Sequence, residues 1–164
     1  GDVYKRQLSF DPNIREPLWK DMEDARTQMA YGLSVCDILK ISDNEIQWFS
    51  GKEDYTEGIH MLQQTYQIPL ILLSMGRDGS RAYYKDMLVE VPAFLQKNTI
   101  ETTGAGDTFG ACCLHHILKY GLDNLTKQQL KEMLTFANAA ASIITTRKGA
   151  LRVMPSLEEI QRLL

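Results

Sequence analysis

Short apolar runs bounded by polar or turn-forming residues recur along the first half of the chain. Three of them span residues 8–11, 37–41 and 70–74. Runs of this length without alternation are typical of strands that are buried on both faces of a parallel sheet. Longer amphipathic segments separate them, and that order favours an α/β fold. We therefore predict buried parallel strands in a doubly wound, mostly parallel sheet with helices on both faces.

Helices and one hairpin are expected in the remaining segments. We predict helices from the apolar spacing, the capping residues and the terminal glycines. They are expected from Pro17 to about residue 31, over residues 43–49, 54–66, 105–120 and 127–145, and after Ser156. Residues 80–84 and 87–91 alternate around the pair Lys85-Asp86, which predicts an antiparallel hairpin. No repeat or linker interrupts this order, so we expect one domain portion.

The composition argues against nucleic-acid binding and against insertion into a membrane. The chain is 44% hydrophobic and has a formal net charge of −3, so it can form a core and carries no basic stripe for nucleic acid. The longest apolar run, residues 69–73, is far shorter than the about 20 residues that cross a bilayer. The cysteines form no C-x-x-C pair, and we interpret them as packing residues. We expect a cytoplasmic enzyme that acts on a small molecule, with no nucleic-acid or membrane partner.

The stretch from Thr102 to Gly110 carries the clearest chemistry. Glycines at 104 and 106 allow backbone N–H groups to converge at the start of an amphipathic helix, where the helix dipole favours an anion such as phosphate. Asp107 follows at once and is a candidate base for a substrate hydroxyl. A plain helix start is the structural alternative. Phe109 stands where a dinucleotide fingerprint needs its third glycine, and the chain has no Walker loop, so neither of those large classes fits.

The sequence E-T-T-G-A-G-D at residues 101–107 resembles the signature of the ribokinase-like (PfkB) carbohydrate kinases. Further blocks of that family follow the same order, at residues 11–15 with 18–19, 40–45, 74–79, 137–141 and 146–150. The resemblance covers residues 8–164 and implies the C-terminal portion of a ribokinase-like nucleotide-binding domain, because the family's N-terminal glycine motif has no counterpart here. Residues 1–7 match no block, and we interpret them as a stretch that is not native.

The resemblance implies a role for each matching position. It implies a catalytic base at Asp107 with an anion-binding turn at Gly104, Ala105 and Gly106. It implies substrate or phosphate contacts at Asn13, Arg15 and Thr103, and nucleotide contacts at Ser74, Gly76, Gly79 and Asn138. It also implies a water-mediated Mg²⁺ contact at Glu45 and a monovalent-cation contact at Glu101. Two positions depart from the family pattern, since Ser42 replaces an asparagine and Glu101 an aspartate. Together with the nearby cation Arg152, the second change weakens the expectation of K⁺ activation.

Several of these positions also have ordinary structural interpretations. Ser42 and Glu45 have the spacing of a capping box. The turn from Ser74 to Gly79 is also compatible with a hairpin entrance, and Asn138 with a surface amide. Arg15 is compatible with a solvated side chain that pairs with Glu16 or Asp21. The sequence leaves these alternatives open.

The implied activity is ATP-dependent phosphorylation of a primary hydroxyl of a small sugar, with Mg²⁺. The form D-P-N-x-R at residues 11–15 resembles fructokinases, which favours a fructose-type substrate. The alternatives are a ketodeoxygluconate, ribose or nucleoside kinase of the same fold, and a non-catalytic nucleotide-binding fragment. The family allows a homodimer of the full-length protein. We expect the fragment alone to be inactive, because the residues that select the sugar lie mainly in the family's N-terminal half.

Overall fold

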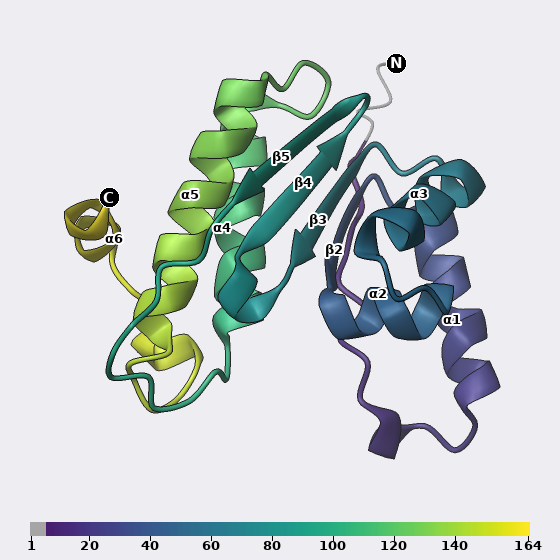
Figure 1. Ribbon diagram of the computed structural model, residues 1–164, viewed down its shortest axis with the longest axis horizontal. Helices are drawn as coiled ribbons and strands as arrows, with labels where there is room; N and C mark the ends of the chain where they lie inside the picture. Colours follow the sequence, from purple (N-terminus) through teal and green to yellow (C-terminus); the bar gives the residue numbers. More distant parts are fainter. Residues whose placement is uncertain (1–5) are drawn as a thin grey trace. The chain divides into compact units, whose positions relative to one another are not determined.

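The computed structural model describes residues 6–164 and contains an open, five-stranded sheet with helices (Figure 1). The strands follow the order β1-β2-β3-β4-β5, with bounds Ser9–Phe10, Ile38–Ser42, Leu70–Ser74, Ser80–Tyr84 and Met87–Val91. β1 pairs with β2 in parallel, with Ser9 opposite Ile38 and Phe10 opposite Leu39. The sheet is mixed and mostly parallel, and the predicted fold class is confirmed.

The first strand differs from its prediction. It was expected over residues 8–11 as a buried strand, but β1 has only two residues, and Ser9 is exposed while Phe10 is half-buried. The physical reason is that, in the sheet formed by residues 6–164, β1 is the outer strand and pairs with β2 alone. Phe10 still packs closely, because a Cβ at Gly32 would lie 2.5 Å from its ring. β2 and β3 are largely buried, as predicted.

The chain divides into two compact units. The first unit holds the described residues up to Leu73 together with Tyr83–Asp86. Its α-helices are α1 (Met22–Val35), α2 (Asp43–Ser50) and α3 (Tyr55–Tyr66). The helix expected from Pro17 is corrected: Glu16–Leu18 forms a separate 3₁₀ turn, and α1 begins only at Met22. Asp21 caps that start by accepting a hydrogen bond from the Glu23 N–H at 2.9 Å.

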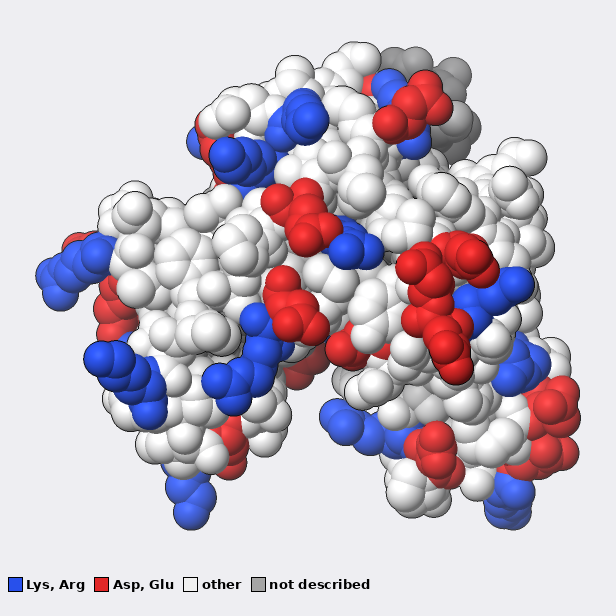
Figure 2. Space-filling view, in the orientation of Figure 1, with Lys and Arg blue, Asp and Glu red and all other residues white. Residues whose placement is uncertain are grey.

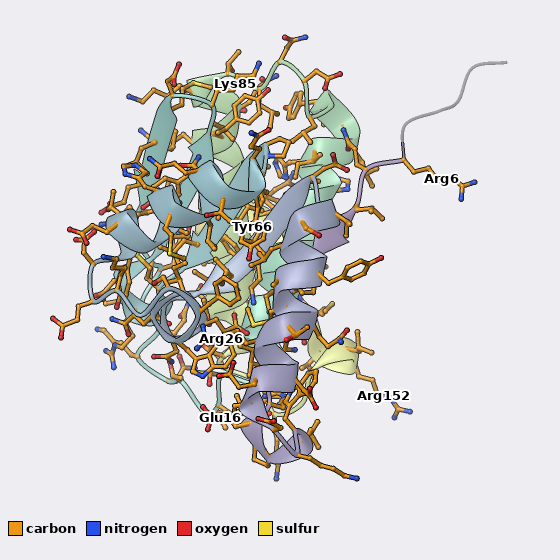
Figure 3. All side chains as sticks on the ribbon, turned by 90° about the vertical axis from the view of Figure 1, so that its right-hand side faces the viewer. Arg6, Glu16, Arg26, Tyr66, Lys85 and Arg152 are labelled. Atoms are coloured by element: carbon orange, nitrogen blue, oxygen red, sulfur yellow. The ribbon has the colours of Figure 1, made fainter. Side chains whose placement is uncertain are left out.

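Helices α2 and α3 pack together in the first unit, where Gly58 of α3 lies against the buried Ile46 of α2, so that a Cβ at Gly58 would lie 3.0 Å from the Ile46 side chain. Arg26 of α1 donates to the backbone carbonyls of Phe49 and Trp48, at 2.8 and 3.2 Å, and its guanidinium stands 4.5 Å from the Trp48 ring centroid. A cation at the carboxyl end of a helix interacts favourably with the helix dipole. Figure 3 shows this side chain directed inward, among the helices of the unit.

The second unit holds Ser74–Ala82 and Met87–Leu164. Its α-helices are α4 (Ala105–Tyr120), α5 (Lys127–Ile144) and α6 (Leu157–Leu163), and Gly76–Asp78 and Leu151–Val153 form 3₁₀ turns. α4 and α5 lie side by side, and α5 also packs on β5 (Figure 1). Ala139 and Ala140 are fully buried, because their small side chains allow α5 to approach its neighbours closely.

Several local predictions are confirmed. The hairpin strands have the predicted bounds, with Lys85 in a left-handed conformation at φ 52°. Gly121 ends α4, and Ser156 with Glu159 forms the predicted capping box of α6. Of residues 1–7, the first five lie outside the described residues, and the interpretation of this stretch stays a prediction.

The cysteines are free and behave as packing residues. Cys36 and Cys113 are buried and Cys112 is half-buried. Burial raises the pKa of Cys36 and of Cys112 to about 11. Among residues 6–164 there is no helix with the length and apolar character of a membrane span. On the face seen in Figure 2, acidic and basic side chains are interspersed.

Candidate active site

The start of α4 differs from that of every other α-helix in the described chain. Gly104 occupies the N-cap with φ 77°, and no side chain caps the helix. The five other α-helices have an N-cap side chain that accepts from their first turn: Asp21, Ser42, Asp54, Thr126 and Ser156. The first turn of α4 therefore keeps N–H groups for something other than its own cap.

Two of those N–H groups are open. Ala105 donates to the Thr102 carbonyl at 3.1 Å, and Thr108 donates to the Gly104 carbonyl at 2.9 Å. Within residues 6–164, the N–H groups of Gly106 and Asp107 have no hydrogen-bond partner. The Ala105 amide is used within the turn in this structure, and its predicted place in the anion-binding turn stays a prediction. The Asp107 side chain is exposed beside the two open amides.

Close packing makes Gly104 specific to this turn. A Cβ on Gly104 would lie 3.2 Å from the Ala150 Cβ and 3.3 Å from the Ile144 Cδ1, and its positive φ disfavours side chains in any case. Any residue other than glycine would move the loop around residue 150 or shift the first turn of α4. The geometry of the open amides therefore depends on the absence of a side chain at position 104.

A cavity of about 490 Å³ adjoins this helix start, and all of its lining residues belong to the second unit. It brings together four of the predicted nucleotide positions, Ser74, Gly76, Gly79 and Asn138, with Ala105 and Gly106 of α4. Thr102 lines it, whereas Thr103 and Asp107 do not. The structure thus joins two groups of residues that are separated in sequence, the turn after β3 and the glycine turn before α4.

Sequence reasoning missed one wall of this cavity. Residues 93–97, which follow β5, line this wall of the cavity. Ala141 and Ser142 of α5 line it with them, as does Thr145, the residue that follows α5. The Gln96 side-chain amide donates to the Ser142 hydroxyl at 3.1 Å, which joins the segment after β5 to α5. No motif marks residues 93–97. The signal that was available is the spacing of Ala141 and Thr145 on the face of α5 that also carries Asn138.

Asn138 is almost fully buried, and its side chain is bonded to the backbone where the segment after β5 begins. Its Nδ2 donates to the carbonyls of Val91 and Pro92, at 3.2 and 3.1 Å, and its Oδ1 accepts from the Ser80 hydroxyl at 2.9 Å. Gly79 meets the same segment, because a Cβ there would lie 2.2 Å from the Val91 carbonyl oxygen. The surface-amide interpretation of Asn138 is wrong, since the side chain lines the cavity while fixing the path of the chain beyond β5.

Glu101 ties the glycine turn to the loop after α5. Its Oε1 accepts from the Gly149 N–H at 2.6 Å, and the Thr145 carbonyl accepts from the amides of Ile100 and Glu101 at 2.8 and 3.3 Å. One carboxylate oxygen of Glu101 is therefore already engaged by the protein. The exposed Arg152 side chain extends away from the ribbon (Figure 3).

The first unit carries the remaining predicted positions on one turn and one helix start. Asn13 is exposed and adopts a left-handed conformation at φ 44°, and Arg15 is exposed. Within the described residues Arg15 forms no ion pair with Glu16 or Asp21, so the solvated-pair interpretation is not what the structure shows. Upstream in the same turn, the two carboxylate oxygens of Asp11 each lie 3.2 Å from the Lys40 Nζ.

Glu45 forms the capping box that its spacing predicts. The Ser42 N–H and hydroxyl donate to Glu45 Oε2 at 2.9 and 2.8 Å, and the Glu45 N–H donates to the Ser42 hydroxyl at 3.3 Å. The second oxygen, Oε1, accepts from the Ile14 N–H at 2.9 Å. This last bond reaches 31 residues back along the chain, and no local motif indicates it.

Comparison with known proteins identifies the family. The sequence model described as pfkB family carbohydrate kinase matches residues 2–157. The chain belongs to the pfkB family of carbohydrate kinases. The family resemblance inferred from the sequence motifs is confirmed.

Several of the similar proteins are fructokinases. The chain is 35% identical to fructokinase-1 of Zea mays over 96% of this chain and 48% of that protein, and 35% identical to the fructokinase of Klebsiella pneumoniae over 94% and 50%. Among solved structures it is similar to the fructokinase of Vibrio cholerae O395 bound to fructose, ADP and calcium ion, with a TM-score of 0.87 and 27% identity, covering 96% of this chain and 50% of that one. The chain spans about half the length of the curated relatives it matches.

Proposed function

We propose that the complete pfkB-family protein transfers the γ-phosphoryl group of ATP to a primary hydroxyl of a fructose-type sugar. The observation that carries this proposal is the uncapped start of α4, where two open amides stand beside an exposed carboxylate at the rim of a cavity. Phosphoryl transfer requires little covalent chemistry from the protein and depends on positioning and charge stabilisation, which such an arrangement supplies. The fructokinase relatives support the choice of sugar.

The cavity suits a nucleotide. Its volume of about 490 Å³ lies within the roughly 300–1,000 Å³ of small-molecule sites. The lining combines apolar groups such as Phe109 and Ala141 with a few polar ones such as Gln96, which suits an aromatic base with polar edges. Ser74, Gly76, Gly79 and Asn138 are proposed to shape the nucleotide part. Ala105 and Gly106 also line the cavity, so a nucleotide lying in it directs its phosphates toward the start of α4.

Asp107 is the proposed base. It accepts the proton of the sugar hydroxyl, while the amides of Gly106 and Asp107 donate to the oxygens of the moving phosphoryl group. In a loose transition state the proton moves late, so orientation matters more than the basicity of the carboxylate. Asn13, Arg15 and Thr103 are the proposed contacts to phosphate or sugar, and a guanidinium suits such an anionic target because of its planar donors.

Mg²⁺ is the proposed metal partner of the nucleotide. Within residues 6–164 no cluster of three or more His, Cys, Asp or Glu side chains is arranged to hold a metal ion. This fits Mg²⁺ that is bound mainly through substrate phosphates, since that ion uses one or two carboxylates and keeps several waters. When bound, Mg²⁺ offsets the charge of the phosphates. Glu45 and Glu101 are the carboxylates proposed for a hydrated Mg²⁺ and for a monovalent cation, and Glu101 enters that role with one oxygen already engaged.

The direct test is an assay of the complete protein with ATP and a panel of acceptors: fructose, ketodeoxygluconate, ribose and adenosine. We expect the highest kcat/KM with fructose. A higher kcat/KM with another acceptor would replace the sugar assignment but keep the kinase. Nucleotide binding by calorimetry, without turnover on any acceptor, would instead support a non-catalytic nucleotide-binding protein and overturn the proposal.

A further inference from the structure

We infer that Glu45 is a positioning residue for the substrate turn, which we define as residues 11–15, and that it acts by holding the Ile14 amide. The inference rests on the proposed function only in assigning Asn13 and Arg15 to the sugar or phosphate. Its structural part, the bond from α2 to the substrate turn, stands on the described geometry alone.

The carboxylate of Glu45 is largely occupied by protein donors. Oε2 accepts from the N–H and the hydroxyl of Ser42, and Oε1 accepts from the Ile14 N–H. An ionised carboxylate offers about four acceptor positions, so three donors leave little of it for other partners. Glu45 is only partly exposed, and N–H bonds to an ionised carboxylate are stronger than bonds between neutral groups.

The substrate turn needs such an anchor. Asn13 has φ 44°, a conformation that side chains other than glycine adopt at a cost and that persists only where the surroundings hold it. Ile14 follows Asn13 directly, so the bond to Glu45 fixes the peptide on the carboxyl side of the strained residue. Lys40 of β2 fixes the other side through Asp11. Asn13 therefore lies between two anchors, and Arg15 follows the second one.

The second oxygen distinguishes this role from helix capping. A capping box at this position works with either glutamate or glutamine, because one oxygen suffices to accept from the N-cap residue. Only glutamate can accept at both ends, from Ser42 and from Ile14. In Glu45→Gln the side-chain NH₂ would face one of these N–H donors, and the cap is the local bond that is easier to keep. The Ile14 bond is the one that this substitution removes.

The first experiment measures the Ile14 amide in the complete protein labelled with ¹⁵N-isoleucine. In the unaltered protein we expect this amide to exchange with solvent at least tenfold more slowly than an exposed loop amide. In Glu45→Gln we expect that protection to be lost, while the amide of Ile59 in the core of α3 keeps its own. Fast exchange of Ile14 in the unaltered protein overturns the inference, even where the variant does not fold.

The second experiment uses steady-state kinetics with matched variants. Glu45→Gln should lower kcat/KM for the sugar about tenfold or more, since small misplacements of contacting groups reduce rates strongly. This loss should persist at saturating Mg²⁺. Ser42→Ala removes the hydroxyl of the cap and leaves the Ile14 bond, so its kcat/KM should stay near that of the unaltered protein. Glu53→Gln, an exposed acid in the same unit, controls for the loss of charge.

These outcomes separate three explanations. If raising Mg²⁺ restores kcat/KM in Glu45→Gln, Glu45 acts through the metal ion and the positioning role is wrong. If Ser42→Ala and Glu45→Gln lower kcat/KM by the same factor, loss of the helix cap alone explains the effect, and the positioning role is again wrong. If the protein phosphorylates none of the acceptors, the proposed function fails, while the exchange of the Ile14 amide still tests the anchor.

Discussion

Helices α2 and α4 begin in opposite ways. At the start of α2, Ser42 and Glu45 satisfy each other's backbone N–H groups, and the second oxygen of Glu45 satisfies Ile14. At the start of α4, Gly104 provides no side chain, and the amides of Gly106 and Asp107 stay open. The first arrangement uses its donors and acceptors to fix the fold, whereas the second keeps its donors for a ligand. The residue at the N-cap decides between the two.

The strongest test of this contrast is Asp107→Asn in the complete protein. The exposed side chain has no partner in the described structure, so we expect only a small change in thermal stability. We expect kcat to fall by about 10² or more, the range for loss of a general base. Glu132→Gln, an exposed acid of α5, is the matched control. Retention of most of the turnover by Asp107→Asn would remove the base assignment.

A pair of glycine substitutions tests whether the open amides depend on Gly104. Gly104 and Gly51 are both left-handed, with φ and ψ of 77° and −2° at Gly104 and of 67° and 15° at Gly51, but of these two only Gly104 has neighbours within 4 Å of an added Cβ. Alanine at either position should destabilise the protein by about 1–2 kcal/mol through left-handed strain. Gly104→Ala should also lower kcat/KM for ATP about tenfold, since a shift of about 1 Å in positioning groups can cost even more. Equal kinetics in the two variants would show that the turn tolerates a side chain.

Removing a cap from another helix should affect stability alone. Thr126 and Gln129 form the capping box of α5, on the exposed side of the second unit. Thr126→Ala should lower the free energy of unfolding by about 1 kcal/mol, the usual value of a cap. Urea unfolding measures this, and sugar kinetics should stay unchanged. A marked loss of activity would mean that the position of α5 is transmitted to the cavity.

The smallest expected effect concerns pH and the cap of α6. The Ser156 N–H and then the Arg147 guanidinium lower the pKa of the Glu159 carboxyl below its usual range. Because the folded pKa is depressed, the stabilisation is present above the unfolded value of about 4.3 and is lost as pH falls through the folded pKa. Glu159→Gln should therefore flatten the decline of the melting temperature below about pH 4.5. An unchanged decline would show that the contact is too exposed to matter.

Local features of the fold were predictable from sequence, and long-range ones were not. Ser42 with Glu45, Ser156 with Glu159 and the hairpin around Lys85 are set by residues within a few positions of one another, and all are confirmed. The start of α1 was misplaced, because Pro17 suits a 3₁₀ turn as well as an α-helix start and Asp21 is the stronger cap. An apolar run alone did not reveal that β1 is the outer strand of the described sheet.

The candidate site shows the same division. The glycine turn before Asp107 could be found by its composition, because glycine and carboxylate must be adjacent there for local geometric reasons. The burial of Asn138 and its bonds to Val91 and Pro92 join residues more than 45 positions apart. The bond from Glu45 to Ile14 is of the same kind. Such contacts depend on tertiary packing, and the side chains involved carry no distinguishing pattern of their own.

The protonated state of the native thiols has a practical use. With a pKa of about 11, Cys36 and Cys112 hold almost no thiolate at neutral pH, and the buried Cys113 holds still less. A cysteine introduced at the highly exposed Leu118 would therefore react with maleimide dyes well before the native ones. A fluorophore could be attached there without first replacing Cys36, Cys112 or Cys113.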